Sequence, residues 1–350
     1  MNWLSHVGLE KLEDSFVVIM REYNEYQDKT ILITGGAGCV GSNLTRRFAD
    51  LGVEKVTVLD NLSSSYEWNI PDYENVEFVK GDILDDATIE KAFDEKPDYV
   101  YHLAAHFANQ NSVDHPEEDL MVNGMGILKV LQYARLSNVD RFVYSSSGCG
   151  VYGLDSEMPF DENDISISLY TPYQVTKLLG ELYTKYFHNL YGMNIVNARF
   201  FNVFGPGEVP GKYRNVIPNF MYWSKNGQTL PITGDGTETR DWAFVDDICS
   251  GLIAMGIEEE AVGEAINLGS GKNHRVIDMA NKINALTGND AGIEYVGRRD
   301  WDVKTDLLSS IDKAKDLLGY SPRVSFDEGL ERTHDWFCEN WDNIRNSAEF

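Results

Sequence analysis

Cysteine is scarce in this chain. Its 350 residues include four cysteines, Cys39, Cys149, Cys249 and Cys338, which are scattered without a C-x-x-C pair. This spacing is that of neither a metal site nor a disulfide framework, and it suits a reducing compartment. No run of residues approaches the roughly 18 apolar residues of a membrane span, and the N-terminus lacks the basic and apolar regions of a signal peptide. We therefore expect a cytoplasmic protein without a membrane partner.

Basic residues are scarce as well. The chain carries 30 Lys and Arg against 56 Asp and Glu, a net charge of −26. Such a charge argues against nucleic acids and anionic membranes as partners. With 43% hydrophobic residues the chain can build a sizeable core, and its length fits one large α/β unit or two lobes. Any Lys or Arg that binds an anionic ligand is therefore a local exception to the negative electrostatic potential of the whole chain.

A glycine-rich segment follows the first predicted strand. Thr30–Thr34 is a short apolar, β-branched run, typical of a buried parallel strand. Gly35, Gly38 and Gly41 come next, and a helical pattern begins at Ser42. In this arrangement the first glycine permits a tight turn, the second lets the backbone approach a pyrophosphate, and the third lets the helix pack closely on the sheet. The helix N-terminus then offers its N–H groups to the phosphates.

An acidic residue ends the next predicted strand. Residues 55–59 have a strand pattern, and Asp60 and Asn61 follow. A carboxylate about 20 residues past the glycines can accept hydrogen bonds from the ribose hydroxyls of adenosine, and it would repel a 2′-phosphate. The order of strand, glycines, helix, strand and acid predicts a dinucleotide site that takes NAD rather than NADP.

Strand and helix patterns alternate as far as Arg199. Further strands are predicted at residues 76–79, 99–103, 141–145 and 195–200, and the helices between them include 86–94, 121–136 and 172–191. This alternation predicts an α/β fold with a Rossmann-type doubly wound parallel sheet. After Phe204 glycine and proline become frequent, which predicts the start of a smaller C-terminal α/β lobe.

The first 28 residues precede the first strand. Apolar residues recur there at roughly helical spacing, which predicts an amphipathic helix. Its apolar face either packs against the same subunit or forms a dimer or partner contact. We therefore divide the chain into an N-terminal helical extension (1–28), an NAD-binding domain (29–203) and a substrate-binding lobe (204–350).

Tyr173 and Lys177 carry the predicted chemistry. They lie four residues apart in a predicted helix and share one face of it. A free phenol has a pKa of about 10, and a neighbouring ammonium and the positive ring of NAD⁺ would both lower it. Tyr173 could then take a proton from a substrate hydroxyl while hydride leaves the same carbon. On its own such a pair is usually a packed aromatic beside a solvated Lys, but its position after a serine run, residues 145–147, favours catalysis.

Several motifs occur in the order of one known family. They are TGGAGCVG from Thr34, Asp60-Asn61, GDI from Gly81, HLAA from His102, the serine run, Tyr173-x-x-x-Lys177, RFFNVFGPG from Arg199 and GDGTETRDW from Gly234. Over residues 30–329 the chain resembles the extended short-chain dehydrogenase/reductase family, in its nucleotide-sugar epimerase/dehydratase branch. The resemblance implies NAD as the cofactor, a homodimer, and a return of residues 241–255 to the NAD-binding domain.

The resemblance also implies site residues. Cofactor contacts are expected from Gly35, Gly38, Cys39, Val40, Gly41, Asp60, Asn61, Asp82, Ile83, Leu103, Ala104, Ala105, Asn123, Tyr173, Lys177 and Phe200. The substrate is expected to be a UDP-sugar, with the diphosphate bound by Asn202, Arg240 and Arg299, and the nucleoside by Asn215, Val216, Ile217 and Asp302. The alternative for the two arginines, whose forks suit phosphate oxygens, is a surface ion pair with Asp241 or Asp300. The loop at 106–116 should face the sugar, and it contains no obvious cation for a carboxylate.

The segment after the serine run departs from the family pattern. The usual S-S-x-x-V-Y-G is here SSSGCGVYG, one residue longer before Val151. Strand register favours Ser147 as the catalytic hydroxyl that hydrogen-bonds the substrate oxygen and Tyr173. Ser146 is its nearest rival, whereas counting back from Tyr152 would point to Gly148.

The same segment bears on the reaction. Family 4,6-dehydratases place an Asp-Glu pair after the hydroxyl residue, and UDP-glucuronate decarboxylases carry a Glu before the Val-Tyr-Gly. This chain has Gly148, Cys149 and Gly150 there, so elimination lacks its acid and base. We expect NAD-dependent epimerisation of a UDP-hexose at C4 through a transient 4-keto sugar. The alternatives are a dehydratase, decarboxylase or 4-ketoreductase on the same scaffold, or a non-catalytic NAD-binding protein.

Overall fold

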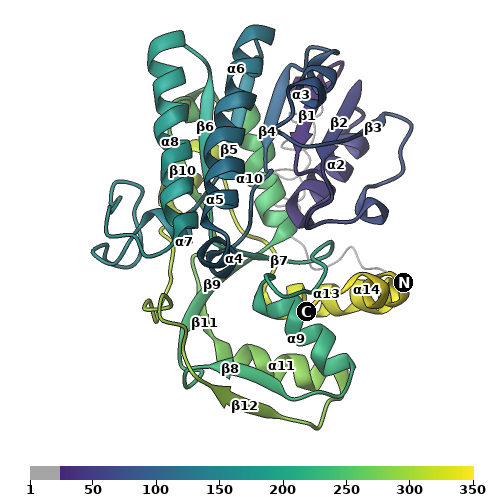
Figure 1. The fold of residues 1–350 in the computed structure, drawn as a ribbon, viewed down its shortest axis with the longest axis vertical. Helices are drawn as coiled ribbons and strands as arrows, with labels where there is room; N and C mark the ends of the chain where they lie inside the picture. The colour runs from purple at the N-terminus through teal and green to yellow at the C-terminus, as the bar shows by residue number, and fades with distance from the viewer. Residues whose placement is uncertain (1–23) are drawn as a thin grey trace, which may run out of the picture.

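The computed structural model describes residues 24–350 (Figure 1). Within that range seven parallel strands form one sheet, which runs in the order β10 (Ala265–Leu268), β6 (Ile195–Phe200), β5 (Arg141–Ser147), β4 (Tyr99–His102), β1 (Thr30–Thr34), β2 (Lys55–Asp60) and β3 (Val76–Lys80). The chain runs outward from β1 to one edge and then from β4 to the other, so a ligand crevice lies at the carboxyl ends of β1 and β4. The doubly wound parallel sheet predicted from the sequence is confirmed.

Helices cover both faces of this sheet. On one face α2 (Cys39–Leu51) packs beside α10 (Val245–Ile257), and on the other α6 (Ile127–Ser137) contacts both α3 (Asp86–Phe93) and α8 (Pro172–Tyr191). Each face has its own core: Ile31 and Ile33 pack into one, and Leu32 between them packs into the other. Successive side chains of a strand point to opposite faces, so a strand covered on both sides is apolar throughout.

The chain after β6 builds a smaller lobe, at the bottom of Figure 1. Its strands β7 (Asn202–Phe204), β9 (Thr239–Phe244) and β11 (Asn273–Arg275) form one sheet, and β8 (Leu230–Thr233) pairs with β12 (Ile293–Val296). Its helices are α9 (Val216–Lys225), α11 (Val276–Thr287), α13 (Phe326–Glu339) and α14 (Trp341–Ser347).

The lobes interleave, but at different residues from those expected. Residues 241–244 belong to β9 in the smaller lobe, so the return to the large sheet begins at Val245 with α10. β10 then pairs with β6, and α12 (Asp312–Leu318) packs against α10 and β10. The sequence prediction left out this edge strand, whose four residues are too few for a clear pattern.

The helix predicted at 121–136 is interrupted. Leu120–Gly126 form a π-helical turn, and α6 begins only at Ile127. Such turns cluster at functional sites, and this one holds Asn123. The strand predicted at 141–145 is also longer than expected, because β5 continues to Ser147. Among residues 24–350, no helix is both long and apolar enough to cross a membrane.

Most of the helical extension predicted at the N-terminus, residues 1–23, lies outside the described residues. Tyr26, just before β1, is fully buried: its hydroxyl donates to the carbonyl oxygen of Ile253 at 2.8 Å and lies 2.7 Å from the hydroxyl of Tyr101. The division into 1–28, 29–203 and 204–350 stays a prediction.

Candidate active site

The glycine-rich segment connects β1 to α2 at the carboxyl edge of the large sheet. Gly35 has a φ of +71°, and a Cβ there would lie 2.6 Å from the amide nitrogen of Ala104. A Cβ on Gly41 would lie 2.3 Å from the carbonyl oxygen of Gly35. Gly38, which has no side chain to cap the helix, is the N-cap of α2, so the first N–H groups, from Cys39 onward, can bind an anion. This turn fits the pyrophosphate of a dinucleotide.

Asp60 ends β2 and braces the glycine segment. Its Oδ2 accepts a hydrogen bond from the amide of Ala37 at 3.0 Å. Its Oδ1 accepts from the amide of Leu62 and from the hydroxyl of Ser65, both at 2.8 Å. A carboxylate offers about four acceptor positions, so Asp60 can hold this loop and still accept a hydrogen bond from a ribose hydroxyl.

The other residues expected at the cofactor lie along the same edge. Asn61 donates to Asp82 at 2.8 Å and joins the loops after β2 and β3, next to the buried Ile83. Val40 is in the first turn of α2, and Phe200 is the last residue of β6. These residues therefore follow or end the strands β1, β2, β3 and β6 at their carboxyl ends.

Asn123 organises the segment after β4, which contains Leu103, Ala104 and Ala105. Its Oδ1 accepts a hydrogen bond from the amide of His106 at 2.8 Å, and its Nδ2 donates to Asp119 at 2.8 Å. Asp119 is fully buried and also accepts from Thr176 of α8 at 2.7 Å. The π-helical turn therefore ties the end of β4 to the helix that carries Tyr173.

Tyr173 and Lys177 lie in the first turns of α8. Pro172 opens this helix, and the side chain of Thr171 caps it by accepting from the amide of Gln174. Lys177 is 3% exposed; its Nζ donates to the carbonyl oxygen of Ser145 at 2.7 Å and lies 5.6 Å from the ring centroid of Tyr173. The expected pair is therefore brought together against the end of β5.

Burial dominates the titration of both groups. It raises the pKa of the Tyr173 phenol well above its ordinary value, with Cys149 and Asp119 adding to the effect and a hydrogen bond from Ser147 opposing it. Burial also lowers the pKa of the Lys177 ammonium to about 8. The expected lowering of the Tyr173 pKa is therefore not met in the protein alone, because desolvation of the phenol raises it. A positive charge on a bound nicotinamide would act in the required direction.

The serine run separates into distinct roles. The Ser146 hydroxyl donates to Glu181, whereas the Ser147 hydroxyl lies near enough to the Tyr173 phenol to lower its pKa. A Cβ on Gly148 would lie 2.2 Å from the ring of Phe201, so a serine would not fit there. Ser147 is the N-cap of the short helix α7 (Gly148–Val151). A Cβ on Gly150 would lie 3.2 Å from the Ser147 Oγ and 3.7 Å from the Cα of Gln174, so Ser147 lies beside the first turn of α8.

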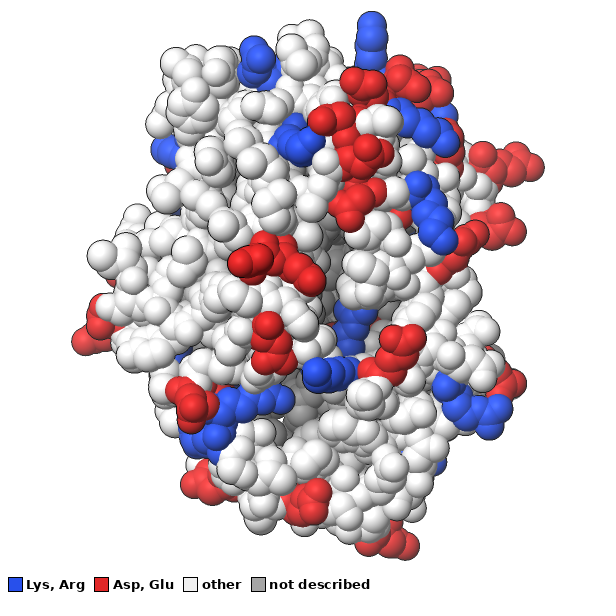
Figure 2. Space-filling view, in the orientation of Figure 1, with Lys and Arg blue, Asp and Glu red and all other residues white. Residues whose placement is uncertain are grey.

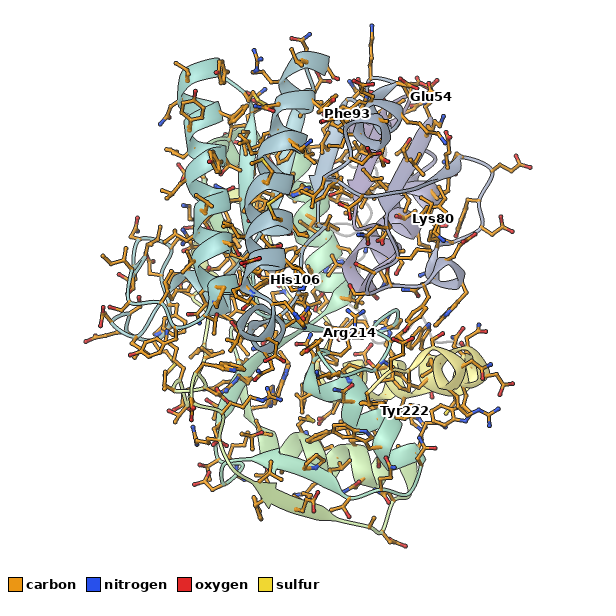
Figure 3. All side chains as sticks on the ribbon, in the orientation of Figure 1. Glu54, Lys80, Phe93, His106, Arg214 and Tyr222 are labelled. Carbon is orange, nitrogen blue, oxygen red and sulfur yellow. The ribbon has the colours of Figure 1, made fainter. Side chains whose placement is uncertain are left out.

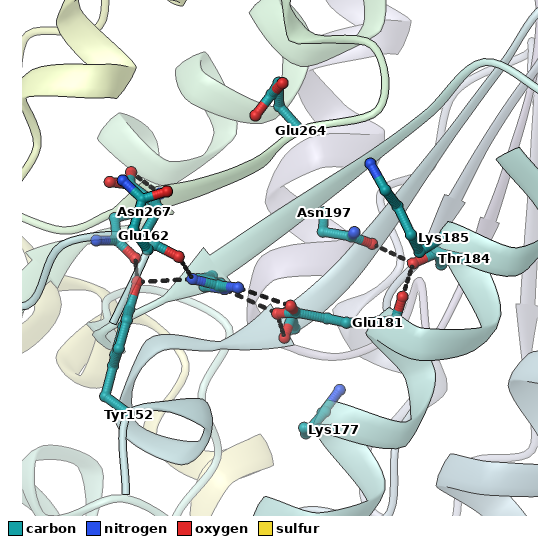
Figure 4. Close-up of polar contacts among 12 residues, drawn as sticks. Tyr152, Glu162, Lys177, Glu181, Thr184, Lys185, Asn197, Glu264 and Asn267 are labelled. Atoms are coloured by element: carbon teal, nitrogen blue, oxygen red, sulfur yellow. Dashed lines mark hydrogen bonds and ion pairs between the residues drawn. The ribbon is translucent and has the colours of Figure 1, made fainter. Parts of the chain in front are cut away.

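A buried ion pair between Arg199 and Glu181 lies next to the carboxyl end of β5 (Figure 4). Arg199 of β6 donates to both carboxylate oxygens of Glu181, each at 2.8 Å. It also donates to the hydroxyl of Tyr152 at 3.0 Å and to the carbonyl oxygen of Glu162 at 2.8 Å. The network is fully hydrogen-bonded around a charge that is 1% exposed, and it fixes Ser146 and Glu181, which lie beside the catalytic pair.

A cavity of about 190 Å³ opens between the lobes, and Asn202, Arg240 and Asp302 form part of its wall. Arg240 lies 3.6 Å from Asp302, not against Asp241, and its Nη1 donates to the carbonyl oxygen of Thr305 at 2.7 Å. Figure 2 shows Lys and Arg side chains within the hollow between the lobes, and acidic side chains around it. The cavity is thus a local exception to the strong negative charge of the chain.

Four expected substrate residues lie elsewhere. Arg299 is exposed, and its guanidinium lies 5.6 Å from the ring centroid of Trp301. Asn215 is the N-cap of α9 and donates to Glu208 at 2.7 Å. Val216 packs against the core, and Ile217 is 1% exposed within it. The structure therefore does not place the Ile217 side chain where it could flank a base, because it lies on the inner face of α9.

Several cavity residues were not anticipated as ligands. Lys304 and Trp301 come from the segment between β12 and α12, and Gln174 comes from α8. Trp301 donates to Gln110 at 2.9 Å and so links the smaller lobe to α4 (Asn109–Asp114). Because the backbone around Lys304 is irregular, its sequence has no periodicity from which the direction of the Lys304 side chain could have been inferred.

Arg214 was also missed. Figure 3 shows it at the junction of the two lobes. It is half-buried, and burial lowers the pKa of its guanidinium, while the nearby Glu208 carboxylate opposes that shift. Burial in turn raises the pKa of Glu208 to about 7. The only sequence signal for Arg214 was its place directly before Asn215.

Residues 31–269 match the NAD dependent epimerase/dehydratase family. The chain belongs to this family. Among solved structures it is similar to epimerase Mth375 from the thermophilic, pseudomurein-containing methanogen Methanothermobacter thermautotrophicus. The two chains are 73% identical, with a TM-score of 0.95 over 96% of this chain and 99% of that one.

Two further relatives of this epimerase/dehydratase family are more distant. The UDP-glucose 4-epimerase of Mycolicibacterium smegmatis is 33% identical over 87% of this chain and 97% of that protein. The Bordetella bronchiseptica enzyme WbmF in complex with NAD⁺ and UDP is 36% identical, with a TM-score of 0.79 over 92% of this chain and 96% of that one. The predictions of the family and of NAD as cofactor are confirmed, whereas the homodimer and the cytoplasmic location stay predictions.

Proposed function

We propose that this protein epimerises a nucleotide-sugar of the UDP-hexose class at C4, through a transient 4-keto sugar. The observation that carries the proposal is the joint position of Ser147, Tyr173 and Lys177 at the end of β5, beside a cavity that contains Cys149 where related dehydratases carry an acid. Family membership supports an NAD-dependent reaction on a nucleotide-sugar.

Each residue has a defined part in the proposed reaction. Tyr173 accepts the proton of the C4 hydroxyl, and Ser147 hydrogen-bonds the same oxygen. Lys177, fixed on the carbonyl oxygen of Ser145, places a positive charge beneath the phenol and holds the ribose of the nicotinamide. Bound NAD supplies the hydride acceptor and, in the reverse direction, the donor. C4 loses a hydride while its hydroxyl oxygen loses a proton; the hydride returns to the opposite face of C4 and the proton returns to the oxygen, so no oxidant is consumed.

The cavity favours epimerisation over elimination. Burial raises the pKa of the Cys149 thiol to about 12, so this group stays protonated and cannot act as a base near neutral pH. Asp302 is the one carboxylate among the described residues that line the cavity, and it faces Arg240. Asp119 is buried and accepts hydrogen bonds from Thr176 and Asn123. None of these groups is free to remove a proton from C5.

The substrate contacts form the second part of the proposal. Asn202 and Arg240 bind the diphosphate, Asp302 binds the ribose, and Arg299 closes on the phosphates from the exposed segment before Trp301. Among the alternatives, a 4-ketoreductase uses the same three catalytic residues but consumes reduced cofactor in each turnover.

A panel of UDP-sugars tests this function. Purified protein is incubated without reductant with UDP-glucose, UDP-galactose, their N-acetyl-hexosamine analogues and UDP-glucuronate, and products are separated with mass detection. The proposal predicts a new peak of unchanged mass for at least one sugar. Loss of water or carbon dioxide would replace it with a dehydratase or decarboxylase, and turnover only with added NADH would indicate a reductase.

A further inference from the structure

Lys304 brings an ammonium group into the cavity. It lies in the irregular segment between β12 and α12 and lines the cavity with Cys149, Gln174 and Asn109. Its Nζ donates to the carbonyl oxygen of Tyr152 at 2.9 Å and lies 4.2 Å from the ring centroid of Phe160. These contacts hold the ammonium at the wall of the cavity that Lys304 lines.

This ammonium has no matching negative charge. Among residues 24–350 no carboxylate lies within ion-pair distance of Lys304, and Asp155 acts on it only at longer range. An ammonium has three donor hydrogens, and the carbonyl oxygen of Tyr152 takes one of them. Burial lowers the pKa of Lys304 to about 8, as expected for a charge taken partly out of water without a partner. Two donors and one positive charge are left for a ligand.

The other cation of the cavity is already engaged. The Nη1 of Arg240 donates to the carbonyl oxygens of Thr239 and Thr305 at 2.9 and 2.7 Å, and its Nη2 faces Asp302 at 3.6 Å. Arg240 thus holds the backbone on which Lys304 is carried, and its proposed partner is the diphosphate. Of the two cationic side chains that line the cavity among the described residues, Lys304 is therefore the one that faces no carboxylate.

Cys149 relates Lys304 to the catalytic centre. Cys149 lies two residues after Ser147, and it lines the same cavity as Lys304 and as Gln174, the residue that follows Tyr173 in α8. A sugar ring with C4 at Tyr173 therefore extends its neighbouring substituents past Cys149 toward Lys304. The loop at 106–116, which contains no lysine or arginine, is not needed to supply this cation.

We propose that Lys304 binds an anionic substituent of the sugar, so that the substrate is a nucleotide-linked uronic acid or a related carboxylate-bearing sugar. This inference rests on the proposed C4 epimerisation for the position of the ring at Tyr173. A carboxylate on the half-buried ammonium of Lys304 is a charge-assisted pair, whereas a neutral hydroxymethyl group would leave the charge of Lys304 uncompensated. Lys304 is therefore a specificity-determining residue.

The test compares UDP-glucuronate with UDP-glucose, which differ only at C6. Binding to the NAD-loaded protein is measured by calorimetry, and turnover by chromatography, for wild type, Lys304→Met and Lys304→Arg. We expect wild type to bind UDP-glucuronate at least about 30-fold more tightly than UDP-glucose. Lys304→Met should lose about 30-fold in affinity for UDP-glucuronate and keep its affinity for UDP-glucose. Lys304→Arg should keep most of the preference for UDP-glucuronate. Lys315→Met, a surface lysine in an ion pair with Asp312, is the matched control and should change neither ligand.

The outcomes separate the two proposals. A preference for the uronate in binding that depends on Lys304, without turnover of any sugar, would support the present inference and overturn the proposed function. Epimerisation with equal binding of the two sugars would support the proposed function and overturn the present inference. If Lys304→Met weakened the binding of both sugars equally, Lys304 would be assigned to the diphosphate that they share, and the inference would be overturned.

Discussion

The Nζ of Lys177 donates a hydrogen bond to the carbonyl oxygen of Ser145, 2.7 Å away. This contact joins α8 to the carboxyl end of β5, two residues before Ser147. It fixes the ammonium beneath the ring of Tyr173, at 5.6 Å from the ring centroid, and so sets the relative position of the three proposed catalytic groups. The predictions below follow from this arrangement and from the loops around it.

The two neighbouring serines should differ in their effect on catalysis. Ser147→Ala removes the hydroxyl that faces Tyr173 and should lower kcat by about 10²–10³-fold with little change in stability. Ser146→Ala instead removes a donor to the buried Glu181, and should cost about 1–2 kcal/mol of stability with a much smaller loss of kcat. Steady-state kinetics and thermal unfolding of both variants measure this split. The reverse pattern would assign the catalytic hydroxyl to Ser146.

Gly148 should not tolerate a side chain. A Cβ there would lie 2.2 Å from the Phe201 ring, which packs with Tyr152 and Phe160. Gly148→Ala should therefore destabilise the fold by about 1–3 kcal/mol. Gly297→Ala is the matched control, because a Cβ there would have no neighbour among the described atoms within 4 Å. Denaturant unfolding compares the two, and equal stability would show that the ring can move aside.

Lys177 should make stability depend on pH in the alkaline range. Its pKa is about 8 in the folded protein against an ordinary value of 10.5. Between these values the unfolded chain binds the proton more strongly, so the free energy of unfolding of the wild type rises with pH there. Lys177→Met has no ammonium to deprotonate and so lacks this rise. Its free energy of unfolding relative to that of wild type should therefore fall by up to ~3 kcal/mol from pH 7 to pH 10.5.

The measurement is urea unfolding of the NAD-free protein at several pH values. Lys315→Met, whose side chain is half exposed and paired with Asp312, is the control and should show no such trend. A difference between wild type and Lys177→Met that does not change with pH would mean that the ammonium is not desolvated in the native state.

Asp60 should contribute to NAD affinity. Asp60→Ala removes the acceptor of the Ala37 amide as well as the proposed partner of the ribose hydroxyls. The loss should weaken NAD binding by about 10- to 100-fold, as for hydrogen bonds to a charged group. Calorimetric titration measures it, with the exposed Asp72→Ala as control. An unchanged affinity in Asp60→Ala would remove Asp60 from the cofactor site.

The large sheet and its glycine turn were predictable because local chemistry and fold agree there. Thr30–Thr34 is apolar on both faces, and Gly35 and Gly41 occupy positions where a Cβ would strike the backbone. The helix of Tyr173 was predicted with its observed bounds, since Thr171 and Pro172 mark its start and Gly192 its end.

The rest depended on long-range contacts. Ser146 and Ser147 are adjacent residues of the same type, and the strand register together with the position of Glu181 distinguishes their roles. Ile217 lies in a short run of apolar residues that does not reveal which face of α9 turns inward. Lys304 reaches the cavity from a segment without regular structure, about 130 residues after Tyr173, where no periodicity indicates direction.

The most direct test of the central claim follows a deuterium atom at C4 of the substrate. A UDP-sugar that the panel identifies as a substrate is labelled there and converted in ordinary water, and the C4-epimeric product is analysed by mass spectrometry and NMR. Transient oxidation at C4 predicts that the epimer keeps its deuterium at C4 and that Tyr173→Phe slows its formation by about 10²–10⁴-fold. Loss of the label to solvent, or inversion at another carbon, would contradict the account.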